Sequence, residues 1–319
     1  MKYLVSGYIG FDNFGDEAIA HVLAQKLKNE GAESVTFISS NPQKTAEIHG
    51  VKSCGMFDFV KPMLEADVLI SGGGSLLQDS TSLKSLIYYL GVINTAVLTG
   101  KKVIIYSQGI GPINSKIGIF LTKCSLRFAH QITVRDKGSQ ELLSSWGIHS
   151  ELVKDPVFDL NTVQYAKQDA VCVQLREFKN LSESFLELLA DKITEKFSEK
   201  EVRVISLQDS IDLNICNKFC EMLIKRGHKN VKILFNLSLS EAIKELSSVQ
   251  YLIAMRFHAN VIGIKSDIKT IAIGYDPKVE KLADEYNLPL IKLSNNKESD
   301  IYEQEISFAI DKLFKYPSD

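Results

Sequence analysis

Short apolar runs alternate with stretches of helical periodicity along the whole chain of 319 residues. Strands are predicted at 3–6, 35–38, 67–70, 103–106 and 132–134, and again at 170–175, 202–207, 231–235, 251–254 and 270–273. Parallel strands need a long crossover between them, usually a helix. The alternation therefore predicts an α/β fold with parallel sheets covered by helices on both faces.

The length divides naturally into two such sheets. A typical domain has about 150 residues, and the polar stretch 161–169 is predicted to be the linker. We therefore expect two Rossmann-like domains, residues 1–160 and residues 161–319. A final helix is expected over 301–314, and in two-domain folds of this kind such a helix can cross back to the first domain.

Charge and cysteine content exclude several classes of protein. Lys plus Arg number 37 and Asp plus Glu 39, for a net charge of −2, whereas general nucleic-acid binders are usually strongly basic. The five cysteines form no CxxC, so we expect reduced thiols rather than disulfides, and no metal site. The longest uncharged run, between Lys84 and Lys101, is shorter than the ~20 residues that span a bilayer. We expect a cytoplasmic protein.

The loop after the first predicted strand is rich in glycine and carries two carboxylates and an amide. Ligands of parallel sheets bind beyond the carboxyl ends of the strands. Asp16 is predicted to cap a helix over 17–30, and Asp12, Asn13 and Asp16 are candidates for binding sugar hydroxyls. The spacing is not GxGxxG, so NAD binding is excluded. A purely structural turn is the alternative interpretation.

A triple glycine follows the strand predicted at 67–70. Gly72, Gly73 and Gly74, with Ser75, could present consecutive backbone amides to an anion. Glycine runs also make tight turns, which is the alternative. Asp79 in the same segment and Gln108 after the next strand are further candidates for polar ligand contacts, although the second loop could equally be only rigid.

Arginine is rare in this chain, and half of its arginines fall at the ends of predicted strands. These are Arg135, Arg176 and Arg256. The planar guanidinium suits carboxylate and phosphate geometry. Three arginines at strand ends, in a chain that otherwise uses lysine, indicate a small and densely charged anion as ligand.

The sharpest local motif is Arg256-Phe257-His258, directly after the strand predicted at 251–254. A histidine can exchange a proton near neutral pH. A lone histidine is more often structural, but the neighbouring arginine at a strand end favours chemistry. Lys278 follows the strand at 270–273 and could face an anion, or could simply lie in a helix that Pro277 begins.

The usual nucleotide and hydrolase motifs are missing from the sequence. It contains no GxxxxGK[ST], no HExxH and no GxSxG. It also contains no DxD pair, so the usual metal-bridged nucleotide-sugar site has no support.

Several segments, taken together and in their order along the chain, resemble the polysaccharide pyruvyl transferase family. The resemblance is greatest to its bacterial branch that modifies cell-wall polysaccharide for surface-layer anchoring. They span residues 1–290 and are 7–18, 72–79, 108–112, Arg135-Asp136 with Ser139, Asp155-Pro156, Arg176, Gln208 with Asp212, 256–258 and 275–279. The family often has leucine where this chain has Phe257. A bulky apolar residue should serve the same packing role.

The resemblance implies a GT-B-like fold with the active site in the cleft between the two domains. It implies phosphoenolpyruvate as donor and a pair of hexose hydroxyls as acceptor, typically on an N-acetylmannosamine of a lipid-linked saccharide precursor. The product would be a cyclic pyruvate ketal, with release of inorganic phosphate. No cofactor is implied, and any membrane contact would be peripheral, through the acceptor, at the inner face.

Taken with the local patterns, the resemblance assigns provisional roles to the candidate residues. His258 and Arg256 are expected to be catalytic. Phosphoenolpyruvate is expected to contact Gly72, Gly73, Gly74, Ser75, Arg135, Arg176 and Lys278. The acceptor sugar is expected to contact Asp12, Asn13, Asp16, Asp79 and Gln108.

Two other functions are compatible with these patterns. One is a GT-B glycosyltransferase that uses a nucleotide sugar, since a fold does not fix a function. The other is a non-catalytic anion-binding protein of an envelope pathway. The combination of His258 with three arginines at strand ends argues against the second.

Overall fold

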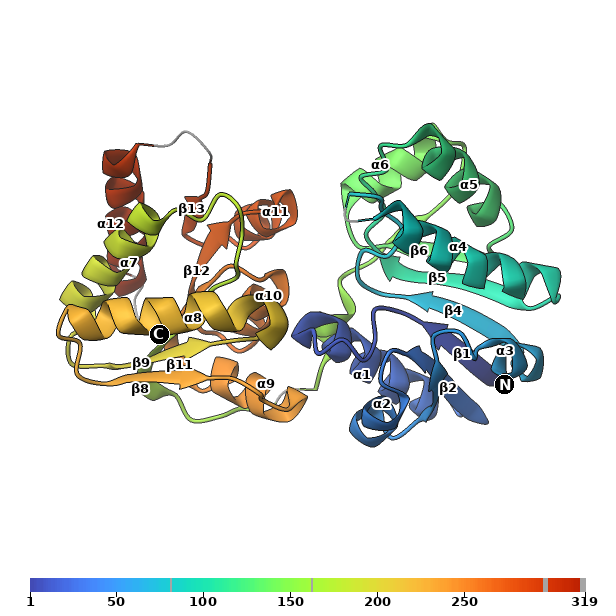
Figure 1. Ribbon diagram of the computed structural model, residues 1–319, viewed down its shortest axis with the longest axis horizontal. Helices are drawn as coiled ribbons and strands as arrows, with labels where there is room; N and C mark the ends of the chain where they lie inside the picture. The colour runs from blue at the N-terminus through green and yellow to red at the C-terminus, as the bar shows by residue number, and fades with distance from the viewer. Residues whose placement is uncertain (81, 162, 295–297, 316–319) are drawn as a thin grey trace. The chain divides into compact units, whose positions relative to one another are not determined.

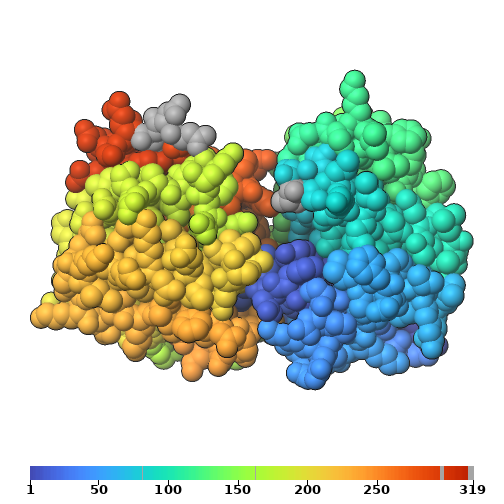
Figure 2. Space-filling model, in the orientation of Figure 1, coloured from blue at the N-terminus to red at the C-terminus, as the bar shows by residue number. Residues whose placement is uncertain are grey.

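In a computed structural model, the chain forms two units, Met1–Leu160 and Asn161–Asp319 (Figure 1). Residues 1–80, 82–161, 163–294 and 298–315 are described. The first unit is coloured from blue to green and the second from yellow-green to red, also in the space-filling view (Figure 2). Each unit contains one parallel sheet with helices on both faces, which confirms the predicted α/β class.

The sheet of the first unit has the strand order β3-β2-β1-β4-β5-β6-β7. The strands are β1 (Lys2–Ser6), β2 (Ser34–Ser39), β3 (Lys52–Gly55), β4 (Val68–Gly72), β5 (Lys102–Gln108), β6 (Gln131–Val134) and β7 (Glu151–Leu152). The central strands are apolar on both faces because helices cover both sides of the sheet. In register, Leu4 of β1 lies opposite Leu69 of β4, and both are fully buried.

The helices of the first unit are α1 (Phe14–Asn29), α2 (Pro42–His49), α3 (Val60–Glu65), α4 (Leu83–Leu98), α5 (Lys116–Leu126), α6 (Lys137–Ser145) and the 3₁₀ helix η1 (Pro156–Asp159). One apolar cluster joins α1 to the sheet through Leu23 and Phe37, and another joins α4 to the opposite face through Ile93 and Ile105. Polar side chains cap most of the helices, as Asp136 does for α6.

The sheet of the second unit has the order β10-β9-β8-β11-β12-β13. Its strands are β8 (Gln168–Gln174), β9 (Glu201–Ile205), β10 (Val231–Leu234), β11 (Val249–Ala254), β12 (Lys269–Gly274) and β13 (Leu290–Lys292). Its helices are α7 (Glu183–Lys196), α8 (Asp209–Lys225), α9 (Leu239–Ser247), α10 (Phe257–Lys265), α11 (Pro277–Glu285) and α12 (Ser299–Lys315).

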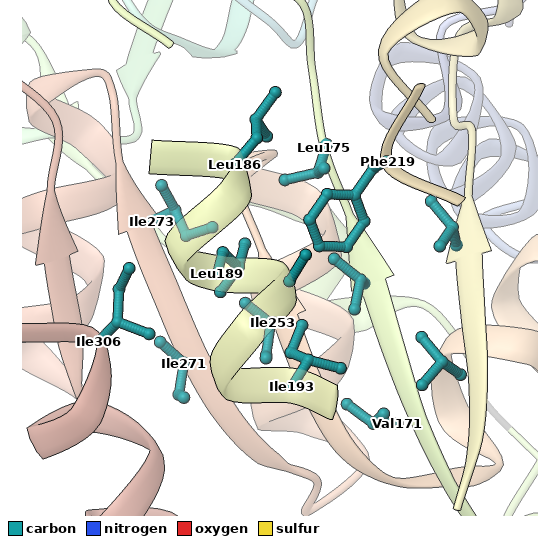
Figure 3. Close-up of a cluster of buried hydrophobic side chains, with 14 of the residues drawn as sticks. Val171, Leu175, Leu186, Leu189, Ile193, Phe219, Ile253, Ile271, Ile273 and Ile306 are labelled. Atoms are coloured by element: carbon teal, nitrogen blue, oxygen red, sulfur yellow. The ribbon is translucent and has the colours of Figure 1, made fainter. Parts of the chain in front are cut away.

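The main core of the second unit lies between its sheet and helices α7, α8 and α12. Figure 3 shows Leu186, Leu189 and Ile193 of α7 directed at the strands, beside Ile253 of β11. The last helix, α12, packs against α7, β12 and β13. Its apolar side chains, such as Ile306, are part of this core, so this helix buries its apolar face within the second unit.

Each sheet has one point where the chain reverses its direction of winding. In the first unit this switch lies between β1 and β4, and in the second it lies between β8 and β11. Open parallel sheets bind ligands beyond the carboxyl ends of the strands at such a switch point. The segments that follow β1, β4, β8 and β11 are therefore the places where functional side chains are expected.

The start of α1 differs from the sequence-based prediction. The helix begins at Phe14, and the Asn13 side chain is its cap, accepting a hydrogen bond from the Gly15 amide at 3.1 Å. The prediction of Asp16 as the cap was wrong because Asn13 is an equally good capping residue and comes first. Asp16 instead lies in the first turn, where a carboxylate interacts favourably with the helix dipole.

Among the residues that the structure describes, every helix is too short or too polar to span a bilayer. The five cysteines are all free thiols. Burial raises the pKa of the Cys172 thiol to about 12 and also raises that of Cys216. These buried thiols are therefore protonated and unreactive at neutral pH.

Candidate functional site

The triple glycine after β4 is required by close packing against the start of α1. Gly73 and Gly74 have φ of 64° and 67°, where an L side chain is strained. A Cβ on Gly73 would lie 2.2 Å from Ile19 Cγ2, and one on Gly74 would lie 2.6 Å from Asp16 Oδ1. The Gly73 amide donates to the Tyr106 carbonyl at 2.8 Å. The Gly73 amide is therefore already hydrogen-bonded within the first unit. The lack of a side chain at Gly74 lets its backbone lie close to the Asp16 carboxylate.

Arg135, after β6, is held in a buried ion pair. Its Nη1 lies 2.7 Å from Asp155 Oδ2, and the side chains are 6% and 3% exposed. Its Nη2 donates to Ser75 Oγ at 3.0 Å. The structure thus brings together two residues predicted to contact phosphoenolpyruvate, Ser75 and Arg135. The carboxylate of Asp155, in the same unit, compensates the charge of Arg135.

The other candidates of the first unit lie in different surroundings. Asp12 is exposed and pairs with Lys44 at 2.6 Å. Asp79 accepts hydrogen bonds from the amides of Asn114 and Ser115, which hold the pKa of its carboxyl below the ordinary value. Asp79 therefore fixes the segment before α5 and stays ionised at neutral pH.

Gln108, at the end of β5, is fully buried. Its Nε2 donates to Ser71 Oγ on β4 at 2.8 Å. Its Oε1 is also buried and accepts no hydrogen bond within the described residues. An unsatisfied buried carbonyl is costly, so Gln108 is one of the few polar groups in this unit whose hydrogen-bonding capacity is not filled.

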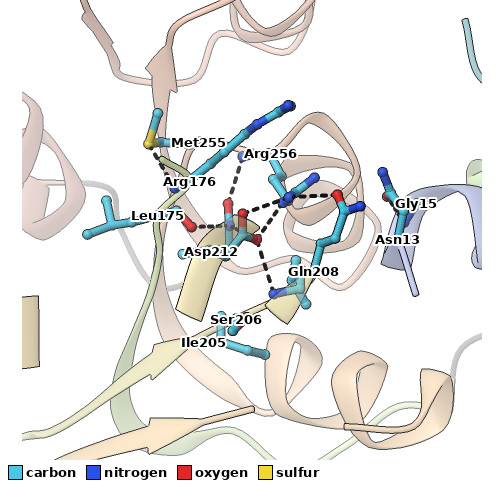
Figure 4. Close-up of polar contacts among 12 residues, drawn as sticks. Asn13, Gly15, Leu175, Arg176, Ile205, Ser206, Gln208, Asp212, Met255 and Arg256 are labelled. Carbon is cyan, nitrogen blue, oxygen red and sulfur yellow. Dashed lines mark hydrogen bonds and ion pairs between the residues drawn. The ribbon is translucent and has the colours of Figure 1, made fainter. Parts of the chain in front are cut away.

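Arg256, after β11, is held by the buried carboxylate of Asp212 on α8 (Figure 4). Its Nε donates to Asp212 Oδ2 and its Nη2 to Asp212 Oδ1, both at 2.6 Å, and Nη2 also reaches Gln208 Oε1 at 3.1 Å. Asp212 is 0% exposed. This bidentate geometry fixes the guanidinium plane. Nη1 makes no hydrogen bond to any residue in the described part of the chain.

Gln174, the last residue of β8, joins this pair to the sheet. Its Oε1 accepts from the Arg256 amide at 2.7 Å, and its Nε2 donates to the Leu175 carbonyl at 2.8 Å and reaches Asp212 Oδ2 at 3.4 Å. The Leu207 amide also points to Asp212 Oδ2, at 3.3 Å. The position of Arg256 is thus set by groups from β8, α8 and the end of β9.

Arg176, after β8, brings a charge that is not compensated in the same way. Its Nη1 donates to the Tyr275 hydroxyl at 3.3 Å, and its guanidinium lies 5.6 Å from the centre of the Tyr275 ring. Its Nε is buried and makes no hydrogen bond within the described residues. No carboxylate of the described residues forms an ion pair with it. Arg176 therefore leaves positive charge at the carboxyl ends of the strands.

His258 lies in the first turn of α10, two residues after Arg256. Its ring is half-buried and packs edge-on against Phe257, with ring centres 5.1 Å apart. Arg256 is the N-cap of α10, and its side chain makes no capping hydrogen bond. The first amides of α10 therefore open toward the same strand ends. This arrangement can combine an acid–base group with cationic and N–H donors.

Lys278 lies in the first turn of α11, after β12. Its side chain is 41% exposed, and its Nζ is 3.8 Å from Asp276 Oδ2. Asp276 also caps the helix by accepting from the Lys278 amide at 2.9 Å. Lys278 is near Tyr275 in sequence, and Tyr275 contacts Arg176. The helix that the sequence predicted with Pro277 in its first turn is present.

Four residues that shape these sites were not among the candidates: Asp155, Gln174, Asp212 and Tyr275. Asp155 and Asp212 belong to segments that carry the family resemblance, but nothing in the sequence paired them with an arginine. Gln174 did have a signal, because it is a buried polar side chain at the end of an apolar run, Ala170–Val173. No group of three or more His, Cys, Asp or Glu side chains that could hold a metal ion is found among the described residues.

Comparison with known families identifies the family of this chain. Residues 13–277 match the sequence profile of the polysaccharide pyruvyl transferase family. The chain belongs to this family. It is therefore an enzyme that transfers a pyruvyl group to polysaccharide. Both units are covered by the match, including Arg135, Arg176, Arg256 and His258. A comparison with curated proteins gave no match.

Solved structures show the same fold for this pyruvyl transferase. MnaA of S. aureus, in a structure with UDP, has a TM-score of 0.66 at 8% identity, covering 99% of this chain and 88% of that chain. A UDP-GlcNAc 2-epimerase from Neisseria meningitidis, bound to UDP-GlcNAc, has a TM-score of 0.64 at 10% identity, covering 99% and 92%. That from Methanocaldococcus jannaschii has 0.63 at 11%, covering 100% and 94%. These likenesses confirm the GT-B-like fold.

Proposed function

We propose that this enzyme transfers pyruvate from phosphoenolpyruvate to two hydroxyls of a hexose in a cell-wall or envelope polysaccharide precursor. The product is a cyclic ketal, and inorganic phosphate is released. The acceptor that the family resemblance implies is an N-acetylmannosamine, free or lipid-linked, of the kind that anchors surface-layer proteins. The observation that carries this proposal is the combination of Arg176, Arg256 and His258 at the switch point of the second sheet.

The charges of this site suit phosphoenolpyruvate. The donor carries a carboxylate and a phosphate, and Arg176 supplies positive charge that no carboxylate of the described residues compensates. Arg256 is neutralised by Asp212, so its contribution is a donor of fixed direction at Nη1 rather than net charge. Hydrogen bonds to charged groups are the strong ones. We assign the main charge compensation of the donor to Arg176 and its orientation to Arg256.

His258 is assigned the proton transfers. A proton added to the methylene carbon of phosphoenolpyruvate makes the central carbon electrophilic, and one sugar hydroxyl attacks that carbon. Phosphate then leaves with its bonding electron pair, and the second hydroxyl closes the ketal. The two hydroxyls release two protons, of which one replaces the proton given to the methylene and the other leaves with phosphate. A histidine can both donate and accept at neutral pH.

The first unit is assigned contacts with the acceptor sugar. Asp12 and Asn13 lie in the loop after β1 and are exposed or half-buried, so hydroxyl groups can reach them. Asp16, Asp79 and Gln108 remain proposed acceptor contacts, and Gly72–Ser75, Arg135 and Lys278 remain proposed donor contacts. We propose that the reaction needs no metal or cofactor, and that it takes place in the cytoplasm or at the inner face of the membrane.

The test is to incubate the full chain with phosphoenolpyruvate and a panel of hexose and N-acetylhexosamine glycosides, and to measure phosphate and product mass. We expect phosphate release that depends on the acceptor, together with a product whose mass has increased by one pyruvate ketal. The same activity should persist in the presence of a chelator. A lipid-linked precursor is included as an acceptor because a free glycoside can lack groups that the enzyme recognises.

Two results would contradict the proposal. If nucleotide sugars raise the unfolding temperature and are hydrolysed while phosphoenolpyruvate does neither, the enzyme uses a nucleotide sugar. If phosphoenolpyruvate binds but no acceptor on the panel, lipid-linked precursor included, gives phosphate release, the chain is an anion-binding protein. The His258→Ala variant serves as the control for contaminating phosphatase, because such activity would persist in it.

A further inference from the structure

Helix α5 exposes two large apolar side chains and buries mainly small or hydroxyl-bearing ones. Its buried residues are Gly118, Thr122, Ser125 and, at its end, Leu126. Its exposed face carries Ile117 and Phe120, each 65% exposed. Surface helices normally turn their apolar stripe toward the core. The outward apolar stripe of α5 therefore lacks an explanation from the packing of the first unit.

The small inward face of α5 allows it to lie close against α4. A Cβ on Gly118 would lie 3.1 Å from Leu86 Cδ2 of α4. The Thr122 hydroxyl donates to the Gly118 carbonyl at 2.7 Å, and the Ser125 hydroxyl donates to the Leu121 carbonyl at 3.0 Å. These hydroxyls thus need no partner outside the helix. Figure 1 shows the two helices side by side on one face of the sheet.

Further exposed apolar side chains lie on α4 and just past the end of α5. Ile87 of α4 is 47% exposed, and Phe128 is 62% exposed. We call the outward side chains of α4, α5 and the following Arg127 and Phe128 the α4–α5 face; it belongs to the teal and green surface of Figure 2. An apolar surface of this kind on a soluble protein indicates an interaction site.

The charges on this face are all of one sign. Between Asp79 and Asp136 the sequence contains no acidic residue, so α4, α5 and the residues just after α5 carry only basic charges. Basic residues are about as dense here as in the rest of the chain, so the positive charge of this segment comes from its lack of acidic residues. Lys84, Lys116 and Arg127 are exposed beside the apolar side chains. Acidic residues return on the flanking helices, with Glu65 on α3 and Glu141 on α6.

We propose that the α4–α5 face docks on the surface of an anionic lipid bilayer. Exposed apolar and aromatic side chains that enter the interface, combined with basic side chains that meet lipid headgroups, are the two signals that give stable peripheral binding. Charge complementarity favours this occupant over a second copy of the chain, because two uniformly basic faces repel each other. The contact is made by the protein itself and does not depend on the acceptor or on the proposed donor.

The test is vesicle sedimentation with the full chain, which has a readout independent of activity. We expect binding to vesicles of phosphatidylcholine with phosphatidylglycerol, much weaker binding to phosphatidylcholine alone, and a decrease with salt because exposed charges are screened. The double variant Ile117→Ser, Phe120→Ser should bind at least about tenfold less tightly. Lys84→Glu should lose about fivefold or more, the equivalent of one basic residue near the membrane.

Phe308→Ser is the matched control, because Phe308 of α12 is 70% exposed in the second unit and lies outside the face. It should bind vesicles like the unchanged protein. Equal binding to neutral and anionic vesicles, no vesicle binding, or unchanged binding by the α4–α5 variants would each overturn the proposal. Self-association that the same variants abolish, without vesicle binding, would identify the face as a contact between copies of the chain.

Discussion

The ends of the two parallel sheets carry similar residues in different electrostatic states. In the first unit, Arg135 forms an ion pair with Asp155 and a hydrogen bond with Ser75. The space beside the glycine run is occupied by the side chains of Ile19 and Asp16. In the second unit, Arg256 is also paired with a buried carboxylate. Arg176, however, has no such partner among the described residues, and it lies near the helix that carries His258.

This difference suggests that paired arginines stabilise the fold, whereas an arginine without a carboxylate partner can bind a ligand. A buried arginine with its own carboxylate adds little net charge for a ligand, whereas an arginine that hydrogen-bonds only to a tyrosine keeps its charge available. The sequence presented Arg135, Arg176 and Arg256 as equivalent residues at strand ends. Only their partners distinguish them, and for this reason we propose the second unit as the place where the anionic donor binds.

The strongest test of this comparison is His258→Ala. General acid–base catalysis contributes about 10²–10⁴ in rate, so kcat should fall by that factor while the KM for phosphoenolpyruvate changes by a few-fold at most. Steady-state kinetics with the best acceptor measure both. His149→Ala, which removes an exposed histidine of the first unit, is the control. Turnover close to that of the unchanged enzyme would remove the catalytic role from the second unit.

Arg135→Met tests the architectural side. Removing one partner of a buried ion pair costs about 3–5 kcal/mol of stability, because it leaves the buried Asp155 carboxylate without its cation. The free energy of unfolding, measured with denaturant, should fall by that amount. The double variant Arg135→Met, Asp155→Leu should recover a large part of it. A single variant as stable as the original protein would show that the pair does not hold the first unit together.

Arg176→Gln tests the uncompensated charge. A hydrogen bond to a charged group contributes about 1.5–3 kcal/mol, so the KM for phosphoenolpyruvate should rise by about 10–100-fold, with little change in the free energy of unfolding. Arg256→Gln should behave differently, since it leaves Asp212 buried without its cation and lowers stability as well. If the two variants had the same effects on KM and stability, the proposed division between charge and orientation would be wrong.

The smallest effect is expected from His21 in the first unit. Burial, and then the neighbouring His49 and Lys28, lower the pKa of His21. The unfolded chain therefore binds a proton more readily than the folded one. The contribution of neutral His21 is present above the unfolded pKa of about 6.5 and is lost as the pH falls below it, toward the folded value.

Replacing this histidine isolates its contribution to the pH dependence. In His21→Gln, the unfolding temperature should decrease less between pH 7 and pH 5 than it does in the original protein. Thermal unfolding at several pH values measures the difference. His149→Gln, which replaces an exposed histidine of the same unit, is the matched control. An identical slope in His21→Gln and the original protein would show that His21 titrates alike in both states.

The sequence predicted the central strands well, since those strands are apolar and buried on both faces. It missed β3, β7 and β13, which are short strands at or near the edges of the sheets. An edge strand such as β3, with the sequence Lys-Ser-Cys-Gly, is only partly buried and carries no apolar run. Its position is determined by the backbone of its neighbour, which a local pattern does not reveal.

The site shows the same limit. The Arg256–His258 motif was visible because it directly follows an apolar strand. The partner of Arg256, Asp212, lies 44 residues earlier in the chain, and the partner of Arg135, Asp155, lies 20 residues later. In the sequence, these two aspartates look like any other acidic residue, because the choice of partner depends on tertiary packing. The roles of individual arginines therefore required the structure.

Gln174 has a consequence for how the second unit assembles. Its amide connects the end of β8 with the Arg256 backbone and with Asp212 on α8, so Arg256 takes its final direction after β8, β11 and α8 have all come together. A partly folded second unit would present the same side chains without this geometry. Donor binding should therefore stabilise the fully assembled second unit, and the protection of its amides from hydrogen exchange should rise on adding phosphoenolpyruvate.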